Sequence, residues 1–129
     1  MSNFTEELQH LPDFHAFSGA SREQIEHTEP VLGVNFSDEY RMYLTTFGTA
    51  SACGQEFTGI CKSPCLNVVD VTMSERMRHS ILPEKWYVVE QTNIDDVVIW
   101  QSEKGEIWQT VPNHLHQKIC GSLREYLEL

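Results

Sequence analysis

The residues best suited to bind a metal are four cysteines: Cys53, Cys61, Cys65 and Cys120. Cys61 and Cys65 are separated by three residues, and His114 and His116 could add ligands from one face of an extended segment. Structural zinc sites usually contain two such close cysteine pairs, and this chain has one. We interpret the cysteines as small buried side chains or inert loop thiols, and we predict no metal and no cofactor.

Carboxylates near predicted turns are a second candidate, because a pair of carboxylates can exchange protons as acid and base. Asp95 and Asp96 come shortly after Glu90, and Glu103 lies near Glu106. Carboxylates in turns more often accept hydrogen bonds from the local backbone, so we favour that interpretation. Their remaining use is as an acidic docking surface for a partner.

No motif in the sequence positions a nucleophile or a nucleotide. The phosphate-binding patterns GxxxxGKS/T and GxGxxG are absent, as are the GxSxG turn of hydrolases and the HExxH zinc motif. A Cys-His-Asp arrangement could be assembled from the cysteines and histidines, but nothing places those residues together. We therefore predict no catalytic residues and no enzymatic activity.

The chain is strongly acidic, with nine Lys and Arg against nineteen Asp and Glu and a net charge of −10. Nucleic acids and anionic membrane surfaces favour basic proteins, so we expect the chain to bind neither. An acidic surface suits a basic protein partner, although acidity also serves solubility alone.

The N-terminal sequence MSNFTEELQHL lacks the basic and apolar regions of a signal peptide. No apolar run approaches the ~20 residues that a membrane-spanning helix needs. We therefore expect a cytoplasmic protein whose cysteines are reduced.

The best specified element is a helix within residues 32–48, LGVNFSDEYRMYLTTFG. Its apolar residues recur at the spacing of one helical face. These residues are Phe36, Tyr40, Tyr43, Leu44 and Phe47. Ser37 can cap the first turn, and Gly48 follows the last apolar residue, where a left-handed cap favours glycine. The aromatic face must be buried, and a β-sheet is its expected partner.

Four further helices are expected at Asn3–Leu11, Ser21–Leu32, Thr72–Ser80 and Ser122–Glu128. Pro12 ends the first, and capping-box spacings mark the start of the other three. Pro30 should kink the second helix or end it early. Between these two helices, Phe14 and Phe17 have the character of buried residues in a linker over residues 14–19.

Five segments resemble strands. The first two, Glu56–Cys61 and Leu66–Val71, are separated by a Ser-Pro turn. The other three, Trp86–Gln91, Val97–Gln101 and Glu106–Val111, are joined by short turns and predict an antiparallel meander. The middle strand is apolar on both alternating sets of side chains, as expected if both faces of the sheet are covered. Helices and strands occur in separate runs, which predicts a single α+β domain.

Together these segments resemble the SUKH superfamily, which is named in part after a fungal cell-wall synthesis regulator. The resemblance rests on the helix around residues 32–48, the upstream sequence SGASREQI, the meander and the closing sequence SLREYL. It covers residues 17–129 of the single domain expected over residues 1–129. The signature positions are Leu32, Gly33, Phe36, Tyr40, Tyr43, Leu44, Phe47 and Gly48.

The resemblance implies an α+β fold with a curved, mainly antiparallel sheet and helices packed at one side. It also implies a function, because bacterial members are often immunity proteins of polymorphic toxin systems. Such proteins bind and block a cognate toxin domain, often a nuclease, and the family has no catalytic residues to carry over. The acidity of this chain fits that role independently, because nucleases are commonly basic.

We therefore expect an immunity protein that occludes the basic cleft of a toxin. The expected partner-binding residues are Glu56, Glu90, Asp95, Asp96, Glu103 and Glu106, with Trp86 and Trp108 as aromatic anchors. Two alternatives remain, namely a regulatory or scaffold module without a toxin, and a small zinc-binding protein or enzyme.

Overall fold

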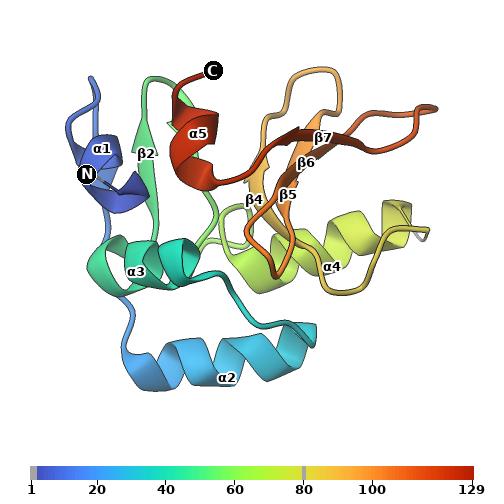
Figure 1. Ribbon diagram of the computed structural model, residues 1–129. Coiled ribbons are helices and arrows are strands. Elements are labelled where there is room, and N and C mark those ends of the chain that lie inside the picture. The colour runs from blue at the N-terminus through green and yellow to red at the C-terminus, as the bar shows by residue number, and fades with distance from the viewer. Residues whose placement is uncertain (1–2, 80) are drawn as a thin grey trace.

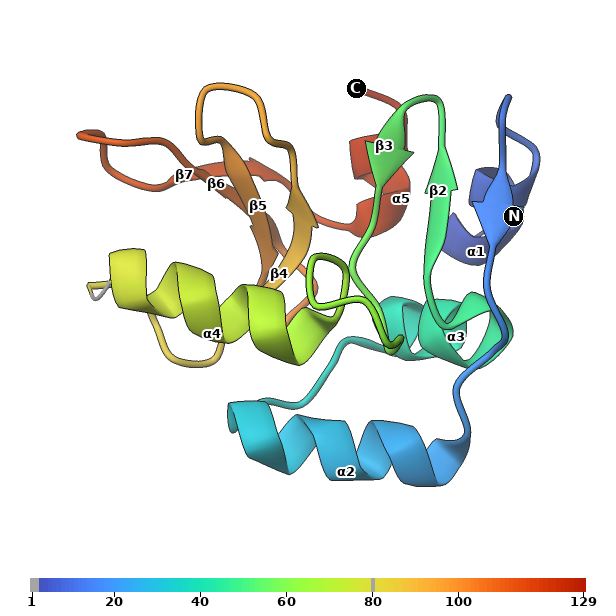
Figure 2. The same cartoon turned by 180° about the vertical axis from the view of Figure 1, so that it is seen from behind.

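The computed structural model describes residues 3–79 and 81–129, which form an α+β fold with two antiparallel sheets (Figures 1 and 2). This fold class confirms the prediction. In chain order the elements are α1 (Phe4–Gln9), β1 (His15–Ala16), α2 (Arg22–Leu32), α3 (Asp38–Phe47), β2 (Ala50–Ala52), β3 (Gln55–Glu56), α4 (Val68–Arg78), β4 (Tyr87–Gln91), β5 (Val98–Gln101), β6 (Ile107–Thr110), β7 (Gln117–Cys120) and α5 (Leu123–Leu127). Among the described residues, no helix combines the length and apolarity needed to cross a bilayer.

Helix α3 forms where the sequence predicts it, because local groups satisfy its ends. The Ser37 hydroxyl oxygen accepts a hydrogen bond from the Tyr40 backbone N–H at 3.1 Å. Gly48 adopts a φ of 69° after the last turn, a conformation that favours a residue without a Cβ. The rings of Tyr40, Tyr43 and Phe47 are all buried, as expected.

The aromatic face of α3 packs against two partners rather than one sheet. The Tyr40 ring centroid lies 5.1 Å from that of Tyr87 in β4. The Tyr43 centroid lies 5.6 Å from that of Phe4 in α1 and 6.5 Å from that of Phe57, which follows β3. Helix α3 therefore joins the large sheet to the N-terminal half of the chain, as Figure 2 shows from behind.

The larger sheet is a meander of β4, β5, β6 and β7 in sequence order. Its first three strands match the predicted segments to within one residue at each end. Strand β7 is absent from the sequence prediction, because it has only four residues, QKIC, and its two polar residues precede its two apolar ones without alternation. The smaller sheet pairs β1, β2 and β3, which are only two or three residues long.

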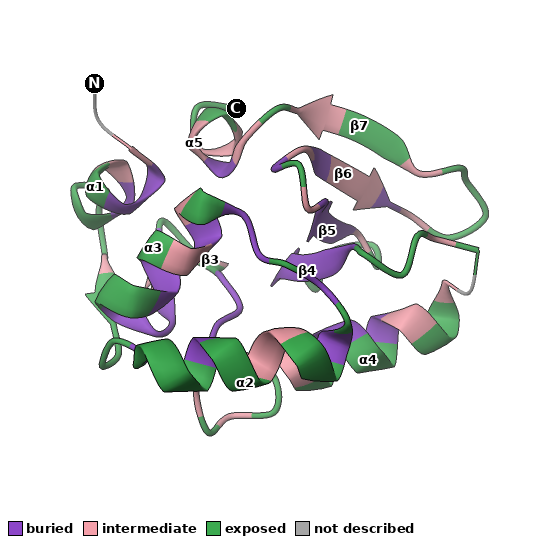
Figure 3. Cartoon of the chain, turned by 60° about the horizontal axis from the view of Figure 1, so that its bottom comes forward, coloured by how far each residue is buried: buried purple, intermediate pink, exposed green. Residues whose placement is uncertain are grey.

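Side chains of the meander alternate between two apolar layers, as a strand requires. Ile99 belongs to the layer that contains the buried residues of α1, α2 and α3, whereas Val98 and Trp100 belong to a second layer with Val71 of α4. Helices therefore cover both faces of the meander, although the resemblance implied helices at one side. Figure 3 shows the buried stripes of α3 and α4 and their exposed outer surfaces.

The largest error of the sequence-based prediction concerns residues 66–80. The predicted strand Leu66–Val71 and the start of the predicted helix Thr72–Ser80 are replaced by one helix, which begins at Val68. The Asn67 side chain caps it by accepting hydrogen bonds from two backbone N–H groups of its first turn, at 2.9 and 3.3 Å. Clustered valines favour a strand in isolation, but the cap and the burial of one face override that preference. Ser80 lies outside the described residues.

Thr72 of α4 and Thr58, which follows β3, form hydrogen bonds with the edge of β4 that does not pair with β5. The Thr72 hydroxyl oxygen accepts a hydrogen bond from the Val88 N–H at 3.0 Å, so Thr72 does not cap a helix with Glu75 as predicted. The Thr58 N–H donates to the Val89 carbonyl at 2.9 Å, and the Thr58 hydroxyl donates to the Val88 carbonyl at 2.7 Å. These contacts leave little of this edge open for pairing with another chain.

Three smaller expectations are also wrong. Phe17 is 57% exposed rather than buried. The strand expected over Glu56–Cys61 is confined to the two residues of β3. Of the two outcomes expected at Pro30, the early end is wrong, because helix α2 continues through Pro30 to its left-handed cap at Gly33.

Candidate binding surface

The expected acidic rim is divided between opposite ends of the meander (Figure 1). Asp95 and Asp96 lie in the β4–β5 turn, whereas Glu103 and Glu106 lie in the β5–β6 turn. Consecutive turns of a meander are separated by the strand between them, which is about 13 Å long for a strand such as β5. The structure therefore does not bring these four carboxylates together.

The carboxylates at the β5–β6 end are engaged within the protein. Glu103 accepts a hydrogen bond from the Asn35 backbone N–H at 2.6 Å. Glu106 lies 3.2 Å from the Lys118 ammonium, which holds the pKa of the Glu106 carboxyl below its ordinary value. Both carboxylates therefore already have partners within the protein, which leaves less of their negative charge available to another molecule.

The carboxylates at the β4–β5 end are open to solvent. Asp95 and Asp96 are exposed, as is Glu56, which lines a small pocket together with Asn93 of the turn. Asn93, Asp95 and Asp96 have φ values of 58°, 52° and 56°, and Asn and Asp adopt this left-handed conformation more readily than other non-glycine residues. The turn thus presents two adjacent carboxylates on a backbone suited to those residue types.

Glu90 is buried, at 5% exposure, so its assignment to an exposed rim is wrong. Its Oε1 accepts hydrogen bonds from the Tyr126 hydroxyl at 2.6 Å and from the Gln55 side chain at 3.2 Å. Burial raises the pKa of Glu90, and these two hydrogen bonds partly oppose that shift. Glu90 therefore connects β4 with β3 and α5 and is not available to a partner.

Trp86 and Trp108 stack on each other, with ring centroids 4.8 Å apart. Trp86 is 6% exposed, so the expectation that it is an exposed anchor is wrong. Trp108 is half-buried, and its ring centroid lies 5.4 Å from that of His116. Both tryptophans belong to or border the apolar layer beneath α4, which leaves Trp108 alone as a candidate anchor.

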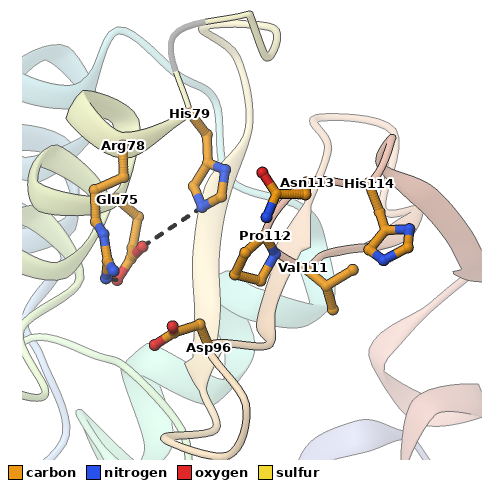
Figure 4. A pocket seen from close by; sticks show the side chains of 8 residues that line it. All are labelled: Glu75, Arg78, His79, Asp96, Val111, Pro112, Asn113 and His114. Atoms are coloured by element: carbon orange, nitrogen blue, oxygen red, sulfur yellow. Dashed lines mark ion pairs between the residues drawn. The ribbon is translucent and has the colours of Figure 1, made fainter.

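A cavity of about 280 Å³ lies where three segments meet beside the β4–β5 turn (Figure 4). The C-terminal part of α4 supplies Glu75, Arg78 and His79, the turn supplies Asp96, and the β6–β7 connection supplies residues 111–114. Polar and charged side chains dominate this lining. The three segments are far apart in the sequence, so only the tertiary structure brings them together.

Glu75 is the buried carboxylate of this cavity, at 5% exposure. Its Oε2 accepts a hydrogen bond from the Gln91 side chain at 2.7 Å, whereas its Oε1 has no donor among the described residues. The nearest nitrogens of His79 and Arg78 lie 3.8 Å from the Glu75 oxygens, beyond hydrogen-bond distance. A buried carboxylate oxygen without a donor is costly, so it calls for an explanation such as a ligand.

The sequence does not mark Glu75 as a site residue, because its spacing from Thr72 is that of a helix cap. A better signal was present in the sequence. Val68, Val71, Thr72 and Glu75 recur at helical spacing, which places the carboxylate on the buried face of α4.

A family model described as SUKH_5, SMI1-KNR4 cell-wall, matches residues 1–129. The chain belongs to this family. Proteins of the SUKH family are generally binding modules rather than enzymes and act through contacts with other proteins. No curated protein matches the chain.

The cysteines of this SUKH_5 chain do not gather into a site. All four are free, with Cys53 and Cys65 exposed and Cys61 and Cys120 partly buried. Within residues 3–79 and 81–129, no group of three or more His, Cys, Asp or Glu side chains is arranged to hold a metal ion. The candidate surface is therefore defined by the cavity beside Glu75 and by the acidic β4–β5 end.

Proposed function

We propose that this SUKH_5 protein is an immunity protein that binds a basic, nuclease-type toxin domain and neutralises it by covering its cleft. The observation that carries the proposal is a net charge of −10 in a member of a family of binding modules. Complementary charge steers association and discriminates between partners. On this proposal the protein acts in the cytoplasm by binding and turns over no substrate.

The proposed contact surface is the β4–β5 end of the molecule. Asp95, Asp96 and Glu56 are exposed there, and none of them forms an ion pair with another described residue. Ile94 of the same turn is 67% exposed and offers an apolar contact beside these charges. Interfaces combine such apolar contacts with a polar rim. Trp108 stacks on Trp86, which precedes β4 at the other end of the meander, so it is not included in this contact surface.

The test is binding of the purified chain to the C-terminal domain encoded by a neighbouring toxin gene, measured by calorimetry together with inhibition of the toxin activity. We expect Asp95→Asn with Asp96→Asn to weaken binding about tenfold or more, because two unpaired charges are lost at the interface. Asparagine tolerates the left-handed backbone of both positions, so the fold should be retained.

The matched control removes the same charge from α2, on the opposite side of the molecule (Figure 1). Glu23→Gln with Glu26→Gln changes two exposed residues, of which Glu26 forms a surface ion pair with Arg22 at 2.9 Å, and should leave the affinity within about twofold. Equal weakening by both double variants would show that no particular end of the molecule is the contact surface. Absence of any complex would overturn the proposal itself.

A second candidate function is a regulatory or scaffold module without a toxin. The description of the matching family as SMI1-KNR4 cell-wall favours it. The two functions differ in gene context and in phenotype, because an immunity gene should lie beside a large toxin gene and protect against its product. Deletion of a scaffold gene would instead change cell-wall or signalling behaviour in the absence of any toxin.

A further inference from the structure

We propose that the cavity beside Glu75 receives an arginine side chain of the partner protein, an inference that rests on the proposed function. The cavity lies next to Asp96, so it belongs to the same end of the molecule as the proposed contact surface. Its volume of about 280 Å³ lies at the lower end of the range of ligand sites, where only a small group fits. It is better matched to a single inserted side chain.

The buried oxygen of Glu75 is the main reason to expect a cation. Glu75 lines the cavity, and its buried Oε1 has no hydrogen-bond donor among the described residues, with His79 Nε2 3.8 Å away; Gln91 donates to its other oxygen. The ion pairs with Arg78 and His79, at 3.8 Å, are too long for hydrogen bonds, so the buried carboxylate can still gain from a charged donor within hydrogen-bond distance. A partner cation supplies such a donor.

A second carboxylate makes a guanidinium the best fit. Asp96 lines the same cavity from the β4–β5 turn, and Figure 4 shows it below Glu75 and His79. A guanidinium carries five donors in a planar fork and can bond to two acceptors at once, whereas an ammonium acts as a point charge. Arginine is therefore favoured over lysine.

The lining of the cavity also suits the apolar stem of an arginine. Val111 and Pro112 of the β6–β7 connection supply apolar surface to its wall. Long basic side chains commonly bury their methylene groups against apolar surface while the charged end reaches a polar partner.

Arg78 does not fill this role within the chain itself. Its guanidinium is 3.8 Å from Glu75 and its side chain is 56% exposed, so it remains a solvated neighbour of the cavity. Its positive charge should oppose entry of another cation. We therefore expect Arg78→Gln to strengthen binding of an arginine ligand.

The test uses Nα-acetyl-arginine methylamide as a probe and amide chemical shifts of the isotope-labelled full chain as the readout. We expect shifts at Asp96, Asn113 and His114, and about tenfold weaker binding for Glu75→Gln. The glutamine keeps an oxygen for the bond from Gln91, and thermal unfolding checks that the variant folds. Asp70→Asn removes the same charge from an exposed position on α4 and should bind the probe like the natural chain.

Several results would overturn the inference. These are the absence of shifts at the cavity at millimolar probe, equal binding by Glu75→Gln, and tighter binding of the matching lysine probe. If the toxin domain binds Glu75→Gln as tightly as the natural chain, the inference fails and the proposed function stands. If the probe binds through Glu75 but no toxin domain binds the chain, the proposed function fails, whereas the inference that the cavity binds an arginine side chain stands.

Discussion

The hydroxyl group of Tyr43 connects three segments of the core. It donates a hydrogen bond to the Thr58 carbonyl at 2.8 Å and accepts one from the Ala50 N–H at 2.9 Å. Tyr43 is fully buried, and this burial raises the pKa of its phenol. The hydroxyl therefore stays protonated and able to donate at any physiological pH.

We expect Tyr43→Phe to lower the free energy of unfolding by about 1–3 kcal/mol, because a buried N–H and a buried carbonyl lose their partner. Tyr40→Phe is the matched control, since it also removes a buried hydroxyl. Its partner, the Thr58 hydroxyl, keeps a hydrogen bond to the Val88 carbonyl, so the loss should be smaller. Urea unfolding measures both values, and a larger loss for Tyr40→Phe would contradict this account.

Glu90 should make the stability of the protein depend on pH. Burial raises its pKa in the folded state, so its stabilising contribution is full below the unfolded pKa of about 4.3 and declines as the pH rises through the folded pKa. Glu90→Gln cannot titrate but retains an oxygen for the Tyr126 hydroxyl. The variant should therefore gain stability relative to the natural protein between pH 4 and pH 7. Urea unfolding at several pH values tests this, and a difference that does not change with pH would refute it.

Among the elements, the end of α3 and the segment after β3 cross at unusually close range. The Ile60 N–H donates to the Gly48 carbonyl at 3.0 Å, and Gly59 lies beside this contact. A Cβ atom at Gly59 would be 1.8 Å from the Gly48 carbonyl oxygen, which is impossible without movement of the backbone. The crossing therefore requires glycine for space rather than for backbone conformation.

We expect Gly59→Ala to destabilise the protein by about 3 kcal/mol or more, because the methyl group must displace main-chain atoms. Gly121→Ala is the control, since the nearest atom to its added Cβ is 3.4 Å away on the flexible Glu125 side chain. That change should cost less than about 0.5 kcal/mol. Thermal unfolding of both variants measures the difference, and similar melting temperatures would show that the crossing can relax.

For the whole molecule, the net charge of −10 should determine how fast a basic partner is captured. Raising the salt concentration from about 50 to 500 mM should lower the association rate about tenfold or more, with a smaller effect on dissociation. Stopped-flow mixing with the toxin domain measures both rates. An association rate that is insensitive to salt would show that the acidity serves solubility and not recognition.

The effect of charge position can be separated from that of total charge. The Asp95→Asn, Asp96→Asn and the Glu23→Gln, Glu26→Gln double variants remove the same number of charges. If only total charge matters, both should slow association equally. If the β4–β5 end is the contact surface, the first variant should have the larger effect on dissociation as well.

The elements that depend on near neighbours could be predicted from the residues alone. The Ser21, Ser37 and Ser122 caps, the aromatic face of α3 and the first three strands of the meander follow from groups within a few residues of one another. The residues also determine the overall charge. These properties need no knowledge of which segments meet, and for that reason they were predicted correctly.

Which acidic residues can contact a partner depends on contacts between segments that are distant in the sequence. The tertiary structure places Glu90 in the interior and separates Asp95 and Asp96 from Glu103 and Glu106 by the length of β5. Residues 68–71, predicted as a strand, form the first turn of α4, and this helix places Glu75 at the cavity. The burial of a side chain and its distance from other side chains depend on contacts between distant segments. Local residue patterns contain little information about such contacts.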